Sequence, residues 1–166
     1  MPERRRRNSL RLAGHDYGDS GYACFVTFKS QIKHLKPDSP LAFNAPLTYP
    51  TLAERIIEAL NHYRQTYRWW VYAYCVMPDH VHMLATPRDG HNLSDTLGAV
   101  ESYVVRLAWE LGVIGKLWQR SFHDSILRPG ADPSKVIAYI LHNPVRAGLC
   151  ARWEEWPWLG MPDPWQ

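Results

Sequence analysis

The sequence has no long apolar run and few cysteines. No stretch approaches the roughly 20 consecutive apolar residues that a membrane-spanning helix requires, and the N-terminal MPERRRRNSL lacks the apolar core of a secretory signal. The cysteines Cys24, Cys75 and Cys150 are far apart and odd in number, which is typical of reduced thiols rather than of a secreted disulfide scaffold or a zinc knuckle. We therefore expect a cytoplasmic protein with no membrane partner, in which the cysteines carry no chemistry.

The sequence also lacks internal repeats, and its 166 residues fit one compact domain. A chain of this size buries roughly two thirds of its extended surface on folding, so neither a disulfide nor a metal is needed to hold it together. We divide it into a basic N-terminal arm over residues 1–20, a main domain over residues 21–150 and an aromatic C-terminal tail over residues 151–166.

Positive charge is gathered near the N-terminus, although the formal net charge is only +3. Arg11 follows an unbroken block that consists of Arg4, Arg5, Arg6 and Arg7. Such a block is either a solvated tail or an arm that binds phosphate groups, and the sequence leaves both open. Most of the eight tryptophans and nine tyrosines must lie in the core, although aromatics beside basic residues also stack on unpaired bases.

Three strands are predicted in the first half of the chain. Residues 22–28 are rich in aromatic and β-branched side chains, which favours a strand. Residues 68–76 and 80–87 form two further strands. The turn between these two is short, which implies an antiparallel pair, and it consists of Met77, Pro78 and Asp79.

Two amphipathic helices alternate with these strands. The first begins near Thr51, which with Glu54 resembles a capping box, and continues for about four turns. The second begins at a capping Asn92 or Ser94 and ends at Gly112.

A fourth strand and a third helix complete the predicted fold. Large residues alternate over residues 116–128, as in a strand. The third helix begins with Asp132 as N-cap and Pro133 in its first turn, and ends near Asn143 because Pro144 disfavours helical geometry before it. This order of elements predicts an α+β fold, a ferredoxin-like split βαβ sandwich with a central antiparallel sheet and an additional C-terminal helix.

Two histidines in the third predicted strand need an explanation of their own. Residues i and i+2 of a strand project from one face about 6.6 Å apart, so His80 and His82 point together while Val81 and Met83 point to the other face. Two imidazoles so placed can share one metal ion. They can equally be ordinary half-buried histidines that hydrogen-bond to the backbone, and a third ligand is needed to decide.

Four stretches, taken in this order, resemble the REP-associated tyrosine transposases of the single-tyrosine HUH superfamily. They are RRRRNSLRLAGHDY with GYACFVTF, then VMPDHVHMLATP, LWQRSFHDSILR, and YILHNPVRAGLC followed by WPW, and together they span most of residues 4–158. The resemblance implies a nuclease and strand-transferase for single-stranded DNA that uses a divalent metal and a tyrosine nucleophile. Residues 21–150 would be its catalytic domain and the third helix its catalytic helix.

The resemblance implies a specific set of site residues. Tyr139 and Asn143 are four residues apart, hence on one face of the third helix. If that face lies against the histidine strand, Asn143 supplies an amide oxygen to the metal beside His80 and His82, and Tyr139 places its phenol above the ion. Two imidazoles and a carbonyl suit Mg²⁺ or Mn²⁺, and without a cysteine ligand a closed structural zinc site is not expected.

The expected reaction is a transesterification. A phenol has a pKa near 10 and is a weak nucleophile at neutral pH until a nearby cation favours the phenolate. A metal bound to the scissile phosphate acts as a Lewis acid and orients an in-line attack by Tyr139. The product is a 5′-phosphotyrosine and a free 3′-hydroxyl. Because one ester replaces another, a different 3′-hydroxyl can reseal the strand without ATP.

Two of these assignments have an alternative, and the positions of two further residues are open. Tyr103 on the second helix is the main alternative nucleophile. His142 is the alternative to Asn143 as ligand. His123 and Asp124 either approach the site or are surface polar residues.

The family recognises imperfect palindromes folded as hairpins, so single-stranded or hairpin DNA is the expected partner. Candidate phosphate contacts are Arg4, Arg5, Arg6, Arg7, Lys116 and Arg120. Two features depart from the family pattern: a proline-rich insertion around residues 36–50, and Asp79 where asparagine or glutamate often precedes the first histidine.

Two other functions and two oligomeric states stay open. A metal-dependent hydrolase would use the same histidines with a water nucleophile, and a catalytically inactive regulator would bind hairpin DNA without cutting it. The protein is either a monomer or a homodimer. We favour the monomer, because no long apolar surface beyond the core can be identified.

Overall fold

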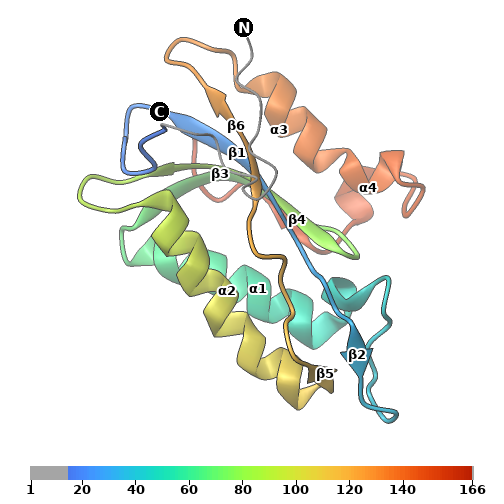
Figure 1. Cartoon of the computed structure of the whole chain (residues 1–166). Coiled ribbons are helices and arrows are strands. Elements are labelled where there is room, and N and C mark those ends of the chain that lie inside the picture. The colour runs from blue at the N-terminus through green and yellow to red at the C-terminus, as the bar shows by residue number, and fades with distance from the viewer. Residues whose placement is uncertain (1–14, 166) are drawn as a thin grey trace, which may run out of the picture.

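The computed structural model describes residues 15–165 (Figure 1). A five-stranded antiparallel sheet has the strand order β6-β1-β4-β3-β7. Its strands are β1 (Ala23–Lys29), β3 (Trp69–Val76), β4 (His80–Pro87), β6 (His123–Leu127) and β7 (Leu159–Gly160).

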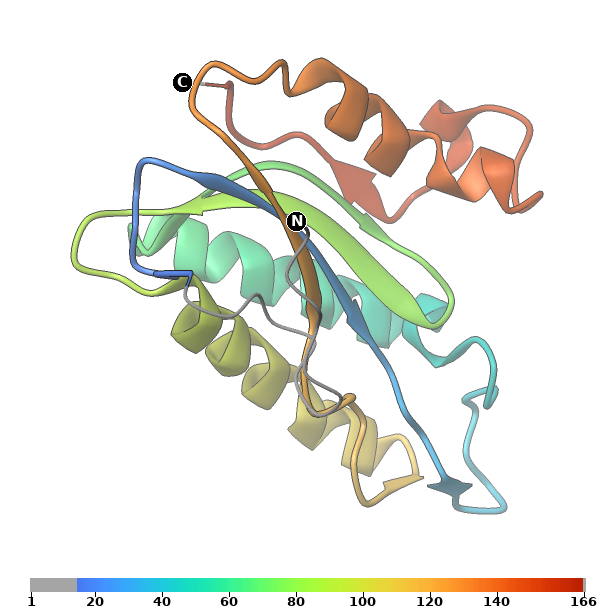
Figure 2. The same ribbon diagram turned by 45° about the horizontal axis from the view of Figure 1, so that its top comes forward.

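Helices cover both faces of this sheet (Figures 1 and 2). One face carries α1 (Pro50–Gln65) and α2 (Leu93–Glu110), and the other carries α3 (Ser134–Leu141) and the short α4 (Asn143–Arg146). Each of the two βαβ units leaves a gap between its strands, which a strand of the other unit fills, so the predicted ferredoxin-like sandwich with an additional C-terminal helix is confirmed.

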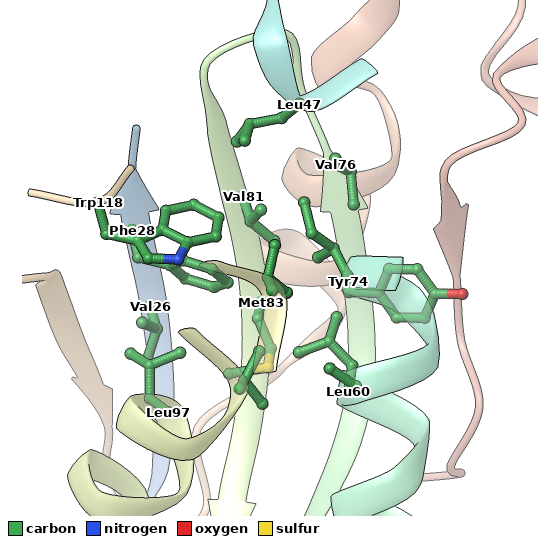
Figure 3. Close-up of a cluster of buried hydrophobic side chains, with 14 of the residues drawn as sticks. Val26, Phe28, Leu47, Leu60, Tyr74, Val76, Val81, Met83, Leu97 and Trp118 are labelled. Carbon is green, nitrogen blue, oxygen red and sulfur yellow. The ribbon is translucent and has the colours of Figure 1, made fainter. Parts of the chain in front are cut away.

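The main core lies between the sheet and α1 and α2. Val81 and Met83 of β4 point into it beside Phe28 of β1, and they meet Leu60 of α1 and Leu97 of α2 (Figure 3). All five side chains are almost completely buried, as the alternation of apolar residues in these strands predicts.

A smaller cluster lies on the opposite face, under α3. The sheet contributes Ala73, Cys75 and Leu84, and α3 contributes Ile140. Because Ile140 is fully buried there, it fixes the height of α3 above the sheet and with it the position of the neighbouring residue on the helix.

The helix starts agree with the sequence predictions only in part. Asn92 caps α2 by accepting a hydrogen bond from the backbone N–H of Asp95 over 3.2 Å. The predicted capping box of Thr51 with Glu54 is wrong, because α1 already begins at Pro50, whose fixed φ and missing N–H suit the first helical position. Thr51 therefore lies inside the first turn, where its hydroxyl cannot cap.

Helical geometry is interrupted before Pro144 and then continues beyond it. It ends at Leu141, the chain bends at His142, and helical geometry resumes as α4 with Pro144 in its first turn. Proline is tolerated there because the first turn needs no intrahelical N–H donor. Residues 143–146 are thereby turned to lie beside the end of α3.

The predicted strand over residues 116–128 is shorter in the structure. Only residues 123–127 form β6, although Gln119 and Leu117 still bond the backbone of Lys29 and Gln31. Gln119 bonds Lys29, and His123 pairs with Thr27. Lys29 and Thr27 are two residues apart in the chain, whereas Gln119 and His123 are four residues apart. The two extra residues between Gln119 and His123 interrupt the strand.

Three short strands were not predicted. Strands β2 (His34–Leu35) and β5 (Val113–Ile114) pair with each other outside the main sheet. In the C-terminal region, β7 pairs with β3, and Asp163 accepts hydrogen bonds from the Val71 backbone and the Arg64 guanidinium. Over residues 15–165, no helix has both the length and the apolar character to cross a bilayer.

Candidate active site

The two histidines of β4 meet on the sheet face that α3 covers. The Nε2 atoms of His80 and His82 are 3.1 Å apart, and the ring centroids are 4.6 Å apart. His82 is 7% exposed, whereas the side chain of His80 is 19% exposed. The pair therefore has one buried and one accessible member, with a nitrogen of each ring directed to the same point.

The other nitrogen of each ring is held by an oxygen. The Nδ1–H of His80 donates to the Asp79 carboxylate over 2.6 Å, and the Thr27 hydroxyl lies 2.8 Å from Nδ1 of His82. Partners of this kind fix the orientation of a metal-binding imidazole and leave its Nε2 lone pair for the ion. Asp79 and Thr27 thus prepare the histidine pair for ligation.

The environment keeps His82 uncharged. Burial, followed by the charges of His80, Arg146 and Lys29, lowers the pKa of His82 to about 3. A neutral imidazole is the form that binds a metal, so His82 needs no proton loss at neutral pH.

Tyr139 of α3 stands over the same point. Its ring centroid lies 5.7 Å from that of His82 and 5.7 Å from that of Phe25, and 43% of its surface is exposed. The tyrosine and the histidines therefore share one face of the sheet. A phenol that is half open to solvent can reach a strand of DNA.

Arg146 was missed by the sequence reasoning. Its Nη2 donates to the Tyr139 carbonyl over 2.9 Å, and its Cζ lies 3.8 Å from the centroid of the Tyr139 ring. Because α3 ends at Leu141 and helical geometry resumes only at Asn143, regular helical spacing does not predict this contact.

Asn143 and His142 differ in exposure. Asn143 is buried at 9% exposure, whereas His142 is exposed, with its Nδ1 3.0 Å from the Ala138 carbonyl and its ring 6.2 Å from that of Trp153. Asn143 is thus the more buried of the two candidate ligands, whereas His142 lies at the surface.

Tyr103, the alternative nucleophile, lies on the other side of the sheet. It belongs to α2, and the Arg55 guanidinium of α1 lies 5.1 Å from the centroid of its ring. The sheet separates it from the histidine pair.

His123 and Asp124 lie on opposite faces of β6. His123 pairs with Thr27, which in turn pairs with His82, so His123 is on the histidine face. Asp124 is buried on the other face, where it accepts a hydrogen bond from the Tyr17 hydroxyl over 2.9 Å. For Asp124, both expectations, proximity to the site and a surface position, are wrong, because the alternation of the strand turns it into the core.

The candidate DNA contacts lie partly outside the described residues. This applies to Arg4, Arg5, Arg6 and Arg7. Lys116 and Arg120 are exposed and border a groove of about 750 Å³ between α2 and residues 113–120, with Lys36 and Trp109 on the same rim.

The site offers few candidate metal ligands. Within residues 15–165, no group of three or more His, Cys, Asp or Glu side chains is placed to hold an ion. The histidine pair nevertheless fits a divalent cation, because both Nε2 atoms converge and both Nδ1 atoms are already engaged. An amide oxygen from Asn143 would be a third protein ligand.

Residues 44–143 match the protein family described as "Transposase IS200 like", which is more than half of the 166 residues. The chain belongs to the IS200-like transposase family. The matched segment contains both histidines and Tyr139, and it ends at Asn143.

Two relatives of this IS200-like transposase agree with that assignment. A protein of Haemophilus influenzae named as a REP-associated tyrosine transposase is 28% identical over 121 residues, which cover 64% of this chain and 69% of the relative. A solved REP-associated tyrosine transposase bound to a REP hairpin has a TM-score of 0.65 at 21% identity, covering 90% of this chain and 82% of its own, and it shows the same fold. The resemblance found in the sequence is confirmed, and the protein is a tyrosine transposase, an enzyme class that transesterifies DNA strands.

Proposed function

We propose that this transposase cuts and rejoins single-stranded DNA beside hairpin-forming palindromes such as REP elements. Tyr139 would be the nucleophile, and His80, His82 and Asn143 would hold a divalent cation. The observation that supports this most strongly is the convergence of two Nε2 atoms, 3.1 Å apart, below a half-exposed tyrosine ring 5.7 Å from that of His82.

The proposed cation is Mg²⁺ or Mn²⁺. Bound there, it supplies Lewis-acid polarisation of an oxygen of the scissile phosphate. Of the proposed ligands, His82 is held uncharged by its environment, and the nearby Asp79 carboxylate is engaged by His80. Such a ligand set suits an ion that takes further oxygen ligands from a phosphate and water.

Tyr139 carries the proposed bond exchange. Its phenolic oxygen attacks the phosphorus, a bond forms between that oxygen and phosphorus, and the bond from phosphorus to the 3′-oxygen breaks. The phenolic proton is lost from Tyr139 and a proton is gained by the departing oxygen, so the products are a 5′-phosphotyrosine and a 3′-hydroxyl. The reverse reaction with another 3′-hydroxyl joins a new strand.

Hairpin DNA is the proposed partner, as the name of the solved REP-hairpin complex indicates for that relative. Positive side chains around the site fit a phosphate backbone, among them Lys29, which pairs with His80 across the sheet, and Arg146 beside Tyr139. Further contacts are proposed from Lys116, Arg120 and the N-terminal block of Arg4, Arg5, Arg6 and Arg7. We propose that the protein acts as a monomer.

The test is the formation of a covalent protein–DNA adduct. Single-stranded hairpin oligonucleotides from the DNA that flanks the gene are incubated with the protein and Mn²⁺, and adducts are resolved under denaturing conditions. Wild type and Tyr103→Phe are expected to form the adduct and Tyr139→Phe to form none. Tyr103→Phe is the matched control because it removes the same hydroxyl from the other side of the sheet.

The outcomes separate the competing functions. Cleavage that forms no adduct and that persists in Tyr139→Phe would indicate a hydrolase with a water nucleophile. Hairpin binding by the wild type without cleavage, even with Mn²⁺, would indicate a regulator that has lost catalysis.

A further inference from the structure

The guanidinium of Arg146 is held against the candidate nucleophile by two contacts. One of its N–H groups donates to the Tyr139 carbonyl, and its plane lies over the Tyr139 ring with Cζ 3.8 Å from the centroid. A guanidinium has five N–H donors, so most of them remain for another acceptor. Within residues 15–165, no carboxylate lies within ion-pair distance of Arg146.

The bend between α3 and α4 explains this placement. The chain leaves helical geometry at His142 and resumes it with Pro144 in the first turn of α4. Arg146 still bonds back to the His142 carbonyl over 3.0 Å, so α4 is anchored to the end of α3. The side chain of Arg146 is thereby returned alongside Tyr139.

Arg146 also acts electrostatically on His82, the buried member of the histidine pair. Its charge is one of the causes that lower the pKa of His82, so the guanidinium lies close enough to act on that ring. Lys29 acts in the same direction, and the nearby acid Asp79 is already bonded to His80. In the part of the chain that the structure describes, neither Arg146 nor Lys29 forms an ion pair with a carboxylate, and a phosphodiester would supply an anionic acceptor.

We propose that Arg146 binds a non-bridging oxygen of the scissile phosphate while its guanidinium stays stacked on Tyr139. One side chain would then hold both the nucleophile and the phosphorus that it attacks. This inference rests on the proposed role of Tyr139. Negative charge on the non-bridging oxygens is what fixed N–H donors stabilise in phosphoryl transfer, and guanidinium geometry suits both the stack and the oxygen.

The experiment compares two hairpin substrates that differ only at the scissile position. One has the natural phosphodiester, and the other has a methylphosphonate, which lacks the negative charge and one non-bridging oxygen. Single-turnover rates of adduct formation at saturating DNA are measured for wild type, Arg146→Gln, Arg146→Lys and Arg152→Gln. Arg152 is the matched control, because it is an exposed arginine of the same region whose guanidinium pairs with Glu154 at 3.7 Å.

Arg146→Gln is expected to slow adduct formation on the phosphodiester by about 100-fold. On the methylphosphonate Arg146→Gln is expected to change the rate little, because the negative charge that the guanidinium would bind is missing. Arg146→Lys should fall between wild type and Arg146→Gln, since it keeps the charge and loses the planar stack. Arg152→Gln should match wild type on both substrates.

An equal loss on both substrates would overturn the proposal, because it would mean that Arg146 only supports the position of Tyr139. If the methylphosphonate is not cut at all, hairpin binding gives the same comparison. Replacing the scissile phosphodiester with the methylphosphonate should weaken hairpin binding by wild type and should not weaken hairpin binding by Arg146→Gln. A wild type that forms no adduct on the phosphodiester would contradict the role of Tyr139, whereas the binding comparison would still test Arg146. Should Arg146→Gln fail to fold by thermal unfolding, Arg146→Lys carries both comparisons.

Discussion

Figure 2 shows α1 and α2 on one face of the sheet and α3 and α4 on the other. The first face is packed with buried apolar side chains, whereas on the second face Tyr139 and His80 are partly exposed. Strand β4 supplies both faces, because Val81 and Met83 enter the main core and the histidines between them point the other way. Alternate residues of β4 therefore contribute to the core on one face and to the candidate active site on the other.

The largest effect is expected on the α3 face. His82→Ala removes one of two imidazoles from the proposed cation site and should lower the rate of adduct formation by roughly 1,000-fold, equivalent to several kcal/mol of transition-state stabilisation. The measurement is single-turnover cleavage of a hairpin with Mn²⁺. A variant that stays as fast as wild type at every Mn²⁺ concentration would show that the histidine pair serves structure only.

Replacement of Met83, the residue next to His82, should lower stability and leave cleavage almost unchanged. Met83→Ala leaves a cavity in the fully buried main core and should lower the free energy of unfolding by about 2–5 kcal/mol. Cleavage per folded molecule should change little, because the side chain points away from Tyr139. Urea unfolding and single-turnover cleavage below the unfolding transition measure the two quantities. Loss of cleavage without loss of stability would contradict the separation of the two faces.

A smaller effect is expected when the orientation of His82 is loosened. Thr27→Val removes the hydroxyl that lies 2.8 Å from Nδ1 of His82 and keeps the shape of the side chain. Partners of this kind are worth about 10–100-fold in metal affinity or activity. The Mn²⁺ concentration that gives half-maximal cleavage should therefore rise. An unchanged Mn²⁺ dependence would show that the ring is held by packing alone.

The last effect is on stability at acid pH in the absence of metal, where it accumulates over several pH units. Burial lowers the pKa of His82 in the folded protein from 6.5 to about 3, so the unfolded chain binds a proton at this site first as the pH falls. The contribution to stability is complete above pH 6.5 and is lost between pH 6.5 and 3, by up to about 1.4 kcal/mol per pH unit. Urea unfolding with a chelator should show a flatter pH dependence for His82→Gln, most clearly above about pH 5, where carboxyl groups stay ionised. Identical slopes for the two proteins would contradict this environment of His82.

Long apolar strands and a capped amphipathic helix made most of the fold predictable. Strands β1, β3 and β4 are runs of seven or eight mostly buried residues, and α2 carries both an N-cap and a terminal glycine with φ +102°. Strands β2, β5 and β7 have two residues each and show no period, so they depend on tertiary pairing that the sequence does not reveal.

The candidate site was predictable where it rests on local spacing. The two histidines fall on one face of a strand because they are two residues apart. The predicted shared helix face of Tyr139 and Asn143 does not come from one continuous helix, because α3 ends at Leu141 and Asn143 begins α4. Arg146 was missed, because its contact with Tyr139 depends on the bend at His142. The support from Thr27 was missed because that residue comes from a neighbouring strand, and its place opposite His82 depends on strand register.

The central claim is that two imidazoles of β4 bind one cation beneath Tyr139. Pulsed electron paramagnetic resonance of Mn²⁺ bound to the protein with an uncleavable hairpin tests it most directly, because imidazole nitrogens couple to the electron spin. We predict coupling to two imidazole nitrogens in wild type and in Tyr139→Phe, and to one in His82→Ala. Mn²⁺ that supports cleavage by wild type and shows no nitrogen coupling would contradict the account.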